Sequence, residues 1–289
     1  TMREAIARSY NVSAVRTGMA VGIEAVAARA HALGIESDLP IVNSLPLGSA
    51  MVSPLEMAQA YIPFATGGIA RRATPILRVE DRYGNLLESN EAPQPGTRVL
   101  TETGAALMLS MLRSVVTSGT ASGTRWYSAG PYSGRDAAGK TGTTSDYADA
   151  WFIGFTPDLA AAVWVGYDDH VVRIRMQNGR GETGGDIAVP IWNRFMRRVF
   201  RGADPASAPS FPGAPSGSIE TAVICRLSGC LANAECGDKA VEEQFWAGTA
   251  PTTYCPIHSS TSPFFSDTTI PDFTEFDRIL GVTSGDASH

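Results

Sequence analysis

The chain has 289 residues and a formal net charge of −6, and it is long enough to form one large domain or two smaller ones. Hydrophobic residues make up 44% of it and charged residues 18%, which is usual for a globular protein. Residues 1–217 carry 20 basic and 19 acidic side chains, whereas residues 218–289 carry 3 and 10. A nearly neutral body with an acidic end argues against nucleic acid as a partner.

The first residues have the sequence of a helix, because Thr1 and Glu4 have the spacing of a capping box. The chain begins with Thr rather than Met and shows no signal-peptide pattern. We therefore expect it to be a piece of a longer protein, with any export signal or membrane anchor upstream. No apolar run approaches the ~18–20 residues that cross a bilayer.

Apolar residues at helical spacing predict helices over residues 4–8, 22–33, 53–68 and 101–119. The third has the strongest start signal. In Ser53-Pro54-Leu55-Glu56, a serine N-cap precedes a proline at the first helical position and a glutamate at the third. A last helix is expected over residues 187–200, with its large apolar side chains on one face: Trp192, Phe195, Met196 and Val199.

Two hairpins are predicted between these helices. Residues 75–88 should turn near positions 83–85, and residues 150–155 and 160–167 are short apolar runs separated by Thr156-Pro157-Asp158. Aromatic side chains in the second hairpin are expected to be core residues of a sheet: Trp151, Phe152 and Trp164.

Composition divides the chain into four segments. Residues 1–201 form the main domain, and residues 202–217 are rich in Pro, Ala, Ser and Gly, as in a linker. Residues 218–258 hold all four cysteines, and residues 259–289 are acidic, with the composition of a disordered tail.

The most specific motif is Lys140-Thr141-Gly142-Thr143. The chain has only two lysines, Lys140 and Lys239, so any catalytic scheme that depends on lysine must use one of them. An ammonium beside two hydroxyls at a strand edge can hold a carboxylate and bias nearby proton transfers. Gly142 has no side chain, so a substrate or another catalytic group can come close to the backbone.

The same lysine completes a P-loop pattern over Gly134 to Thr141, which makes phosphate binding the alternative function. A P-loop needs a buried strand before it and a helix after it. Gly130-Pro131 is incompatible with a central strand on one side, and the residues after Thr141 are a poor helix start on the other. The sequence context therefore disfavours nucleotide binding.

Ser9-Tyr10-Asn11 is a second candidate motif, weak by itself, since a Ser-x-Asn arises about once by chance in a chain of this length. Followed by Lys-Thr-Gly-Thr, it resembles the second and third motifs of serine transpeptidases and β-lactamases. Residues 1–200 are similar in particular to bifunctional (class A) penicillin-binding proteins. The similar stretches are Arg3-Glu4-Ala5, Asn11-Val12, Ala14-Val15-Arg16, Leu47-Gly48-Ser49, Ser53-Pro54-Leu55-Glu56, Ala60-Tyr61, Gly119-Thr120-Ala121, Ala138-Gly139-Lys140, Asp149-Ala150-Trp151-Phe152, Trp164-Val165-Gly166-Tyr167-Asp168 and Thr183-Gly184-Gly185.

The resemblance implies a mixed α/β fold of the serine β-lactamase/DD-transpeptidase type, an antiparallel sheet flanked by helices, here truncated at its N-terminus. It implies that the substrates are the D-Ala-D-Ala ends of peptidoglycan stem peptides, and that β-lactams acylate the same serine. No cofactor is implied. The parent protein would carry an upstream glycosyltransferase domain and a membrane anchor, and would act at the periplasmic face of the bacterial inner membrane.

The resemblance also implies roles for individual residues. Ser9 would relay a proton between the active-site lysine and the departing group, and Asn11 would hydrogen-bond the substrate amide. Lys140 would supply positive potential, Thr141 and Thr143 would bind the terminal carboxylate, and Gly142 would leave room for it. The backbone N–H of Thr143 would form half of the oxyanion hole.

One motif of that family is absent from the sequence. Ser-x-x-Lys places the nucleophile and its activating lysine on one helical face, but Ala137 stands three residues before Lys140 and Cys236 three before Lys239. In the family this motif precedes Ser-x-Asn. We therefore expect the missing segment to lie upstream and the chain alone to be inactive.

The four cysteines, Cys225, Cys230, Cys236 and Cys255, lie in a segment too short to build much core. In an exported protein this predicts two disulfides, in one of three connectivities, ahead of free thiols. Cys255 and His258 could suggest zinc, but the paired C-x₂-C spacing of zinc knuckles is missing, and no metal ligand is assigned.

Overall fold

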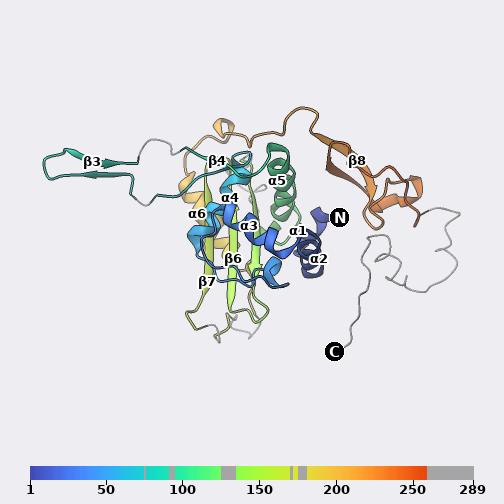
Figure 1. The fold of residues 1–289 in the computed structure, drawn as a ribbon, viewed down its shortest axis with the longest axis horizontal. Coiled ribbons are helices and arrows are strands. Elements are labelled where there is room, and N and C mark those ends of the chain that lie inside the picture. The colour runs from blue at the N-terminus through green and yellow to red at the C-terminus, as the bar shows by residue number, and fades with distance from the viewer. Residues whose placement is uncertain (75, 91–94, 125–134, 170–171, 175–180, 259–289) are drawn as a thin grey trace. The chain divides into compact units, whose positions relative to one another are not determined.

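A computed structural model describes residues 1–74, 76–90, 95–124, 135–169, 172–174 and 181–258 (Figure 1). The chain divides into two compact units. Unit 1 comprises Thr1–Thr221 and Gln244–Ala250, and unit 2 comprises Ala222–Glu243 and Pro251–His289. The acidic segment 259–289 and Gly130-Pro131 lie outside the described residues, so the predictions made for them stay predictions.

Helices form where the sequence places their start signals. Thr1 Oγ1 accepts a hydrogen bond from the Glu4 amide, and Ser53 and Glu56 complete a reciprocal capping box. The helix after Ser9 was not predicted. The α-helices are α1 Met2–Arg8, α2 Asn11–Val21, α3 Ile23–Leu33, α4 Pro54–Ala65, α5 Glu102–Thr117 and α6 Ala188–Val199. The 3₁₀ helices are η1 Leu45–Leu47, η2 Ser122–Thr124, η3 Pro205–Ser207 and η4 Ala234–Lys239.

The central element of unit 1 is an antiparallel sheet of β5 Ala138–Thr143, β6 Asp149–Phe155 and β7 Ala160–Gly166, in the order β5-β6-β7. The three strands run side by side in Figure 1. Both predicted hairpins are present, since β6 pairs with β7 and β2 Arg78–Glu80 pairs with β3 Leu86–Ser89. Two further antiparallel pairs join β1 Ile69–Ala70 to β4 Thr97–Arg98 and β8 Ile219–Cys225 to β9 Ala240–Trp246.

Helices cover both faces of this sheet. Because side chains alternate along a strand, Phe152 and Phe155 of β6 point to opposite faces. Phe152 packs edge-on against Trp192 of α6, with ring centroids 5.3 Å apart, and Phe155 lies 6.0 Å from Tyr61 of α4. The mixed α/β architecture with a helix-flanked antiparallel sheet is therefore confirmed.

Two stretches of the chain differ in burial from what their sequence predicts. On α6, Trp192 and Met196 are buried, but Phe195 and Val199 are 47% and 48% exposed, because they lie on the flank of the buried stripe. Phe211, inside the stretch expected to be a linker, is buried and packs against Phe155 with ring centroids 5.7 Å apart. Its side chain anchors that stretch in the core of unit 1.

The aromatic residues of the second hairpin divide between the core and a less buried position. Phe152 is fully buried, whereas Trp151 and Trp164 are half-buried and face each other with ring centroids 6.2 Å apart. Across the described parts of the chain, no helix is both long and apolar enough to span a membrane.

Candidate active site

The end of α1 holds Ser9 in an unusual backbone conformation. Ser9 has φ 59° and ψ 48°, the left-handed region that costs a non-glycine residue about 1–2 kcal/mol. Its neighbour is fixed, because the Tyr10 amide donates to the Ala5 carbonyl at 2.9 Å. The α1 end is also tied to the end of α5, where the Thr120 amide donates to the Ala7 carbonyl at 3.0 Å. Such strain is common where a fold must aim a functional side chain.

Strand β5 brings Lys140 to this serine. Lys140 Nζ donates to Ser9 Oγ at 2.7 Å, although the two residues are 131 positions apart in sequence. It also donates to the Thr141 carbonyl oxygen at 2.9 Å. The first Ser-x-Asn residue and the lysine of Lys-Thr-Gly-Thr therefore form one polar group. Asn11, the first residue of α2, is exposed two positions after Ser9.

Burial changes the acid–base behaviour of this lysine. Desolvation lowers the pKa of Lys140 from 10.5 to about 8, because a charged ammonium loses water contacts in the fold. The folded state then binds this proton less tightly than the unfolded chain does. The resulting cost to stability is complete below about pH 8, fades as pH rises, and is absent above 10.5.

We predict that Lys140 titrates with a midpoint near pH 8, the value to which burial lowers its pKa. The chain suits this measurement, because Lys239 is the only other lysine. In protein labelled with ¹³C at the lysine ε carbon, NMR would follow both signals with pH, and Lys140→Arg would identify the first by removing it. A midpoint near 10.5 for Lys140 would show that the ammonium is fully hydrated and would contradict this description.

The two threonines of the motif bond to segments outside the sheet. Thr141 Oγ1 and Thr120 Oγ1 are 2.6 Å apart, and Thr143 Oγ1 accepts from the Gly184 amide at 3.0 Å. A hydroxyl has one proton to donate and two lone pairs. Thr143 Oγ1 accepts a hydrogen bond, so its own proton is left for another acceptor. In the Thr141–Thr120 pair, the hydroxyl that accepts likewise has a proton left to donate. The threonines on either side of Gly142 therefore keep hydroxyl protons that a ligand could accept.

Backbone geometry adds an amide donor at the free edge of β5. The Thr144 amide donates to the Asp149 carbonyl of β6 at 3.2 Å. Because successive amides of a strand point to opposite edges, the Thr143 N–H points away from β6. This edge can receive a ligand without breaking the sheet.

Gly142 was expected to leave room for a substrate, whereas Gly184 leaves room for the neighbouring backbone of the protein. A Cβ on Gly184 would lie 2.3 Å from the Trp151 carbonyl oxygen and 2.5 Å from that of Gly142, so the backbone before α6 lies directly against β5 and β6. At Gly142 a Cβ would meet the Trp151 Cβ at 3.2 Å, a tight contact. The space beside Gly142 on that side is thus taken by the Trp151 side chain.

Sequence reasoning identified Ser9, Asn11 and the Lys-Thr-Gly-Thr motif but missed two neighbours, Thr120 and Gly184. Both fall in stretches that were similar to the transpeptidases, Gly119-Thr120-Ala121 and Thr183-Gly184-Gly185. That similarity was the available signal, although it gave no reason to place either residue beside Lys140.

The P-loop alternative gains no support from the structure. Lys140 and Thr141 lie inside β5, and β6 follows after a turn, so the helix that a P-loop requires is replaced by a strand. Gly134, the first residue of the pattern, lies outside the described residues.

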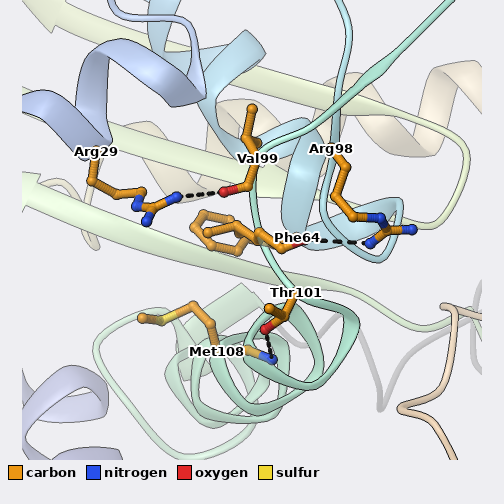
Figure 2. A pocket seen from close by; sticks show the side chains of 8 residues that line it. Arg29, Phe64, Arg98, Val99, Thr101 and Met108 are labelled. Atoms are coloured by element: carbon orange, nitrogen blue, oxygen red, sulfur yellow. Dashed lines mark hydrogen bonds between the residues drawn. The ribbon is translucent and has the colours of Figure 1, made fainter.

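A cavity of about 460 Å³ lies elsewhere in unit 1 (Figure 2). Figure 2 shows Arg29 donating to the Val99 carbonyl above Phe64 and Met108. Its lining includes Gly104 and Met108 from the first half of α5, whereas Thr120 follows the other end of that helix. None of the candidate catalytic residues lines this cavity.

The cysteines do not form the expected disulfides. Cys225, Cys230, Cys236 and Cys255 are all free in the structure. Three of the thiols are buried and grouped with His258, whereas Cys230 lies outside the group. The short spacing along the sequence did not show that the fold would bring three cysteines, rather than two pairs, to one point.

Comparison with known proteins fits this arrangement of motifs. Residues 1–197 match the family described as "Penicillin binding protein transpeptidase domain". The chain belongs to this transpeptidase family. Residues 215–260 match a second family, "Penicillin-binding protein 1A, C-terminal domain".

Relatives and solved structures agree with the two matches. The transpeptidase chain is 35% identical over 206 residues to penicillin-binding protein 1A of Neisseria gonorrhoeae, covering 70% of this chain and 25% of the relative. It is 37% identical over 207 residues to that of Aquifex aeolicus, covering 70% and 26%. The crystal structure of penicillin-binding protein 1A from Haemophilus influenzae superposes with a TM-score of 0.72 at 27% identity, covering 88% of this chain and 41% of that one. The chain thus spans about a quarter of the length of the curated relatives.

Proposed function

We propose that this chain supplies the proton-relay and carboxylate-binding parts of a serine DD-transpeptidase. The donors would be peptidoglycan stem peptides ending in D-Ala-D-Ala, and β-lactams would react as their mimics. The observation that carries the proposal is the 2.7 Å contact from Lys140 Nζ to Ser9 Oγ, which unites the two motifs. Among the solved structures similar to this chain is that of PonA1 of Mycobacterium tuberculosis in complex with penicillin V, at 26% identity and a TM-score of 0.65, covering 75% of this chain and 60% of that one.

The terminal carboxylate of the substrate would be bound at the free edge of β5. Thr143 has a hydroxyl proton left to donate, the Thr141–Thr120 pair has another, and the Lys140 ammonium contributes positive charge. Charge-assisted hydrogen bonds of this kind are about twice as strong as neutral ones. The outward N–H of Thr143 would contribute half of the oxyanion hole, where charge develops on the attacked carbonyl.

Ser9 would carry the proton of the acylation step. When the nucleophilic serine attacks the penultimate D-Ala carbonyl, its proton passes to the lysine of Ser-x-x-Lys, and the departing amine of the last D-Ala must be protonated. Ser9 can donate its own proton to that amine and regain one from that lysine. The hydrogen bond from Lys140 orients the Ser9 oxygen, and Asn11 would hydrogen-bond the substrate amide.

The nucleophile would come from a segment that carries Ser-x-x-Lys, a motif this sequence does not contain. In the longer protein we propose, that segment precedes Ser9, and a glycosyltransferase domain and membrane anchor lie further upstream. Peptide cross-linking would then take place at the periplasmic face of the inner membrane.

The proposal is tested by release of the terminal alanine. The chain preceded by its Ser-x-x-Lys segment should release that alanine from a diacylated L-Lys-D-Ala-D-Ala peptide but not from the same peptide ending in D-Ala-L-Ala. Ser9→Ala should lower the rate on the order of 10²–10⁴-fold, the usual contribution of a positioned acid–base group. Ser44→Ala, which removes an exposed hydroxyl bonded to Ser49, is the matched control. Equal release from both peptides, or a Ser9→Ala rate equal to that of Ser44→Ala, would refute the assignment.

A further inference from the structure

Unit 2 brings four side chains with metal-binding atoms to one point. The Sγ atoms of Cys225, Cys236 and Cys255 and a ring nitrogen of His258 all lie within 4.8 Å of one another. His258 Nδ1 is 3.3 Å from Cys225 Sγ and 3.4 Å from Cys255 Sγ. In a tetrahedral zinc site, with bonds of about 2.3 Å to sulfur and about 2.0 Å to nitrogen, neighbouring ligand atoms are about 3.5 Å apart. The two sulfur–nitrogen distances are close to this value, and the four atoms lie near enough together to surround one ion.

These cysteines are also the core of unit 2. Cys225, Cys236 and Cys255 are 0%, 2% and 2% exposed, and three partly buried apolar side chains pack against them: Ala232, Ala240 and Ile257. Within residues 222–243 and 251–258, the described part of the unit, the only other buried hydrophobic residue is Ile224. The sulfur cluster occupies the place of the missing hydrophobic core.

Neighbouring polar groups hold the four side chains in place. The Asn233 side-chain amide donates to the His258 carbonyl at 2.7 Å, and the Asn233 backbone N–H donates to Cys236 Sγ at 3.4 Å. Amides around thiolate ligands are the outer hydrogen bonds expected of a metal–sulfur site.

Disulfide bonds would not involve all four of these side chains. The cluster contains three thiols, so one disulfide within it would leave a buried thiol and His258 without a role. Cys230 lies apart, with its sulfur 3.8 Å from the Ser228 carbonyl and 3.7 Å from Thr253 Oγ1. A single metal ion would use all four clustered side chains and leave Cys230 free.

We propose that Cys225, Cys236, Cys255 and His258 bind one structural Zn²⁺ that holds unit 2 together. Three sulfurs and one imidazole in a tetrahedral arrangement select zinc among the common metals. All four positions would be filled by protein atoms, as in structural rather than catalytic sites. Three thiolates and a neutral imidazole would offset the two positive charges of the ion.

The test is metal analysis of the full 289-residue chain. We expect one zinc per chain by elemental analysis after dialysis, and four free thiols after denaturation in chelator. Cys236→Ser should lower the zinc content to near zero, whereas Cys230→Ser, the matched control, should keep it. The same chain loaded with Co²⁺ should show the strong visible absorption of tetrahedral cobalt bound to thiolates, which tests the site in the wild-type fold.

Three results would overturn the proposal. The first is a metal-free chain whose unreduced mass is lower by a pair of hydrogen atoms for each disulfide. The second is a chain that holds iron in place of zinc. The third is equal zinc content in Cys230→Ser and Cys236→Ser, with cobalt absorption typical of octahedral oxygen ligands.

Discussion

Replacing Lys140 with alanine should slow penicillin acylation on the order of 10²–10³-fold, the loss typical of a preorganised electrostatic group. The measurement is the second-order rate constant for a fluorescent penicillin, in the chain preceded by its Ser-x-x-Lys segment. The reason is the double role of the ammonium. Lys140 Nζ donates to Ser9 Oγ at 2.7 Å and to the Thr141 carbonyl at 2.9 Å, so it both orients Ser9 and brings positive charge to the motif.

The other lysine of the chain supplies the control. Lys239 bonds to Asp238 in unit 2 and belongs to neither motif of the candidate site, so Lys239→Ala should acylate at the wild-type rate. Lys140→Arg keeps the charge but not the compact ammonium, and should fall between the two. An unchanged rate for Lys140→Ala would mean that the Lys-Thr-Gly-Thr motif is not part of the site. ATP binding that depends on Lys140 would instead favour the P-loop alternative.

The sequence predicted the helices with strong caps and the hairpins with clear alternation, because these signals are local. Ser53 and Glu56 satisfy each other's backbone within one turn, and this pair marked the start of α4 correctly. Helix α2 lacked such a signal, since Tyr10 makes no side-chain cap bond, and it was missed. Phe211 also escaped prediction, because its burial depends on Phe155, far away in sequence.

The sequence predicted the motifs of the candidate site but not the hydrogen bonds that connect them. Ser9, Asn11 and Lys140 stood out through a family resemblance, whereas the contact between Ser9 and Lys140 arises because α1 packs on α5 and α5 packs on β5. Thr120 and Gly184 join the site only through hydrogen bonds to Thr141 and Thr143.

The metal-binding group was missed for a related reason. Cys225 and Cys236 are on different elements of unit 2, and no C-x₂-C pair marks them. Only the fold brings them to Cys255 and His258. The C-x₂-C rule for zinc knuckles finds ligands that are close together in sequence. Here strand pairing and turns bring Cys225 and Cys236 to Cys255 and His258.

We propose that this chain holds the relay and recognition groups of a transpeptidase but not its nucleophile. The most direct test is to incubate the purified 289-residue chain with a fluorescent penicillin and to separate the product on a denaturing gel. Covalent acylation requires a serine activated by a lysine one helical turn away, and the chain has no such pair. We expect no fluorescent band for this chain and a stoichiometric band once the Ser-x-x-Lys segment precedes it. A stoichiometric band from the 289 residues alone would place the nucleophile inside this sequence and contradict the account.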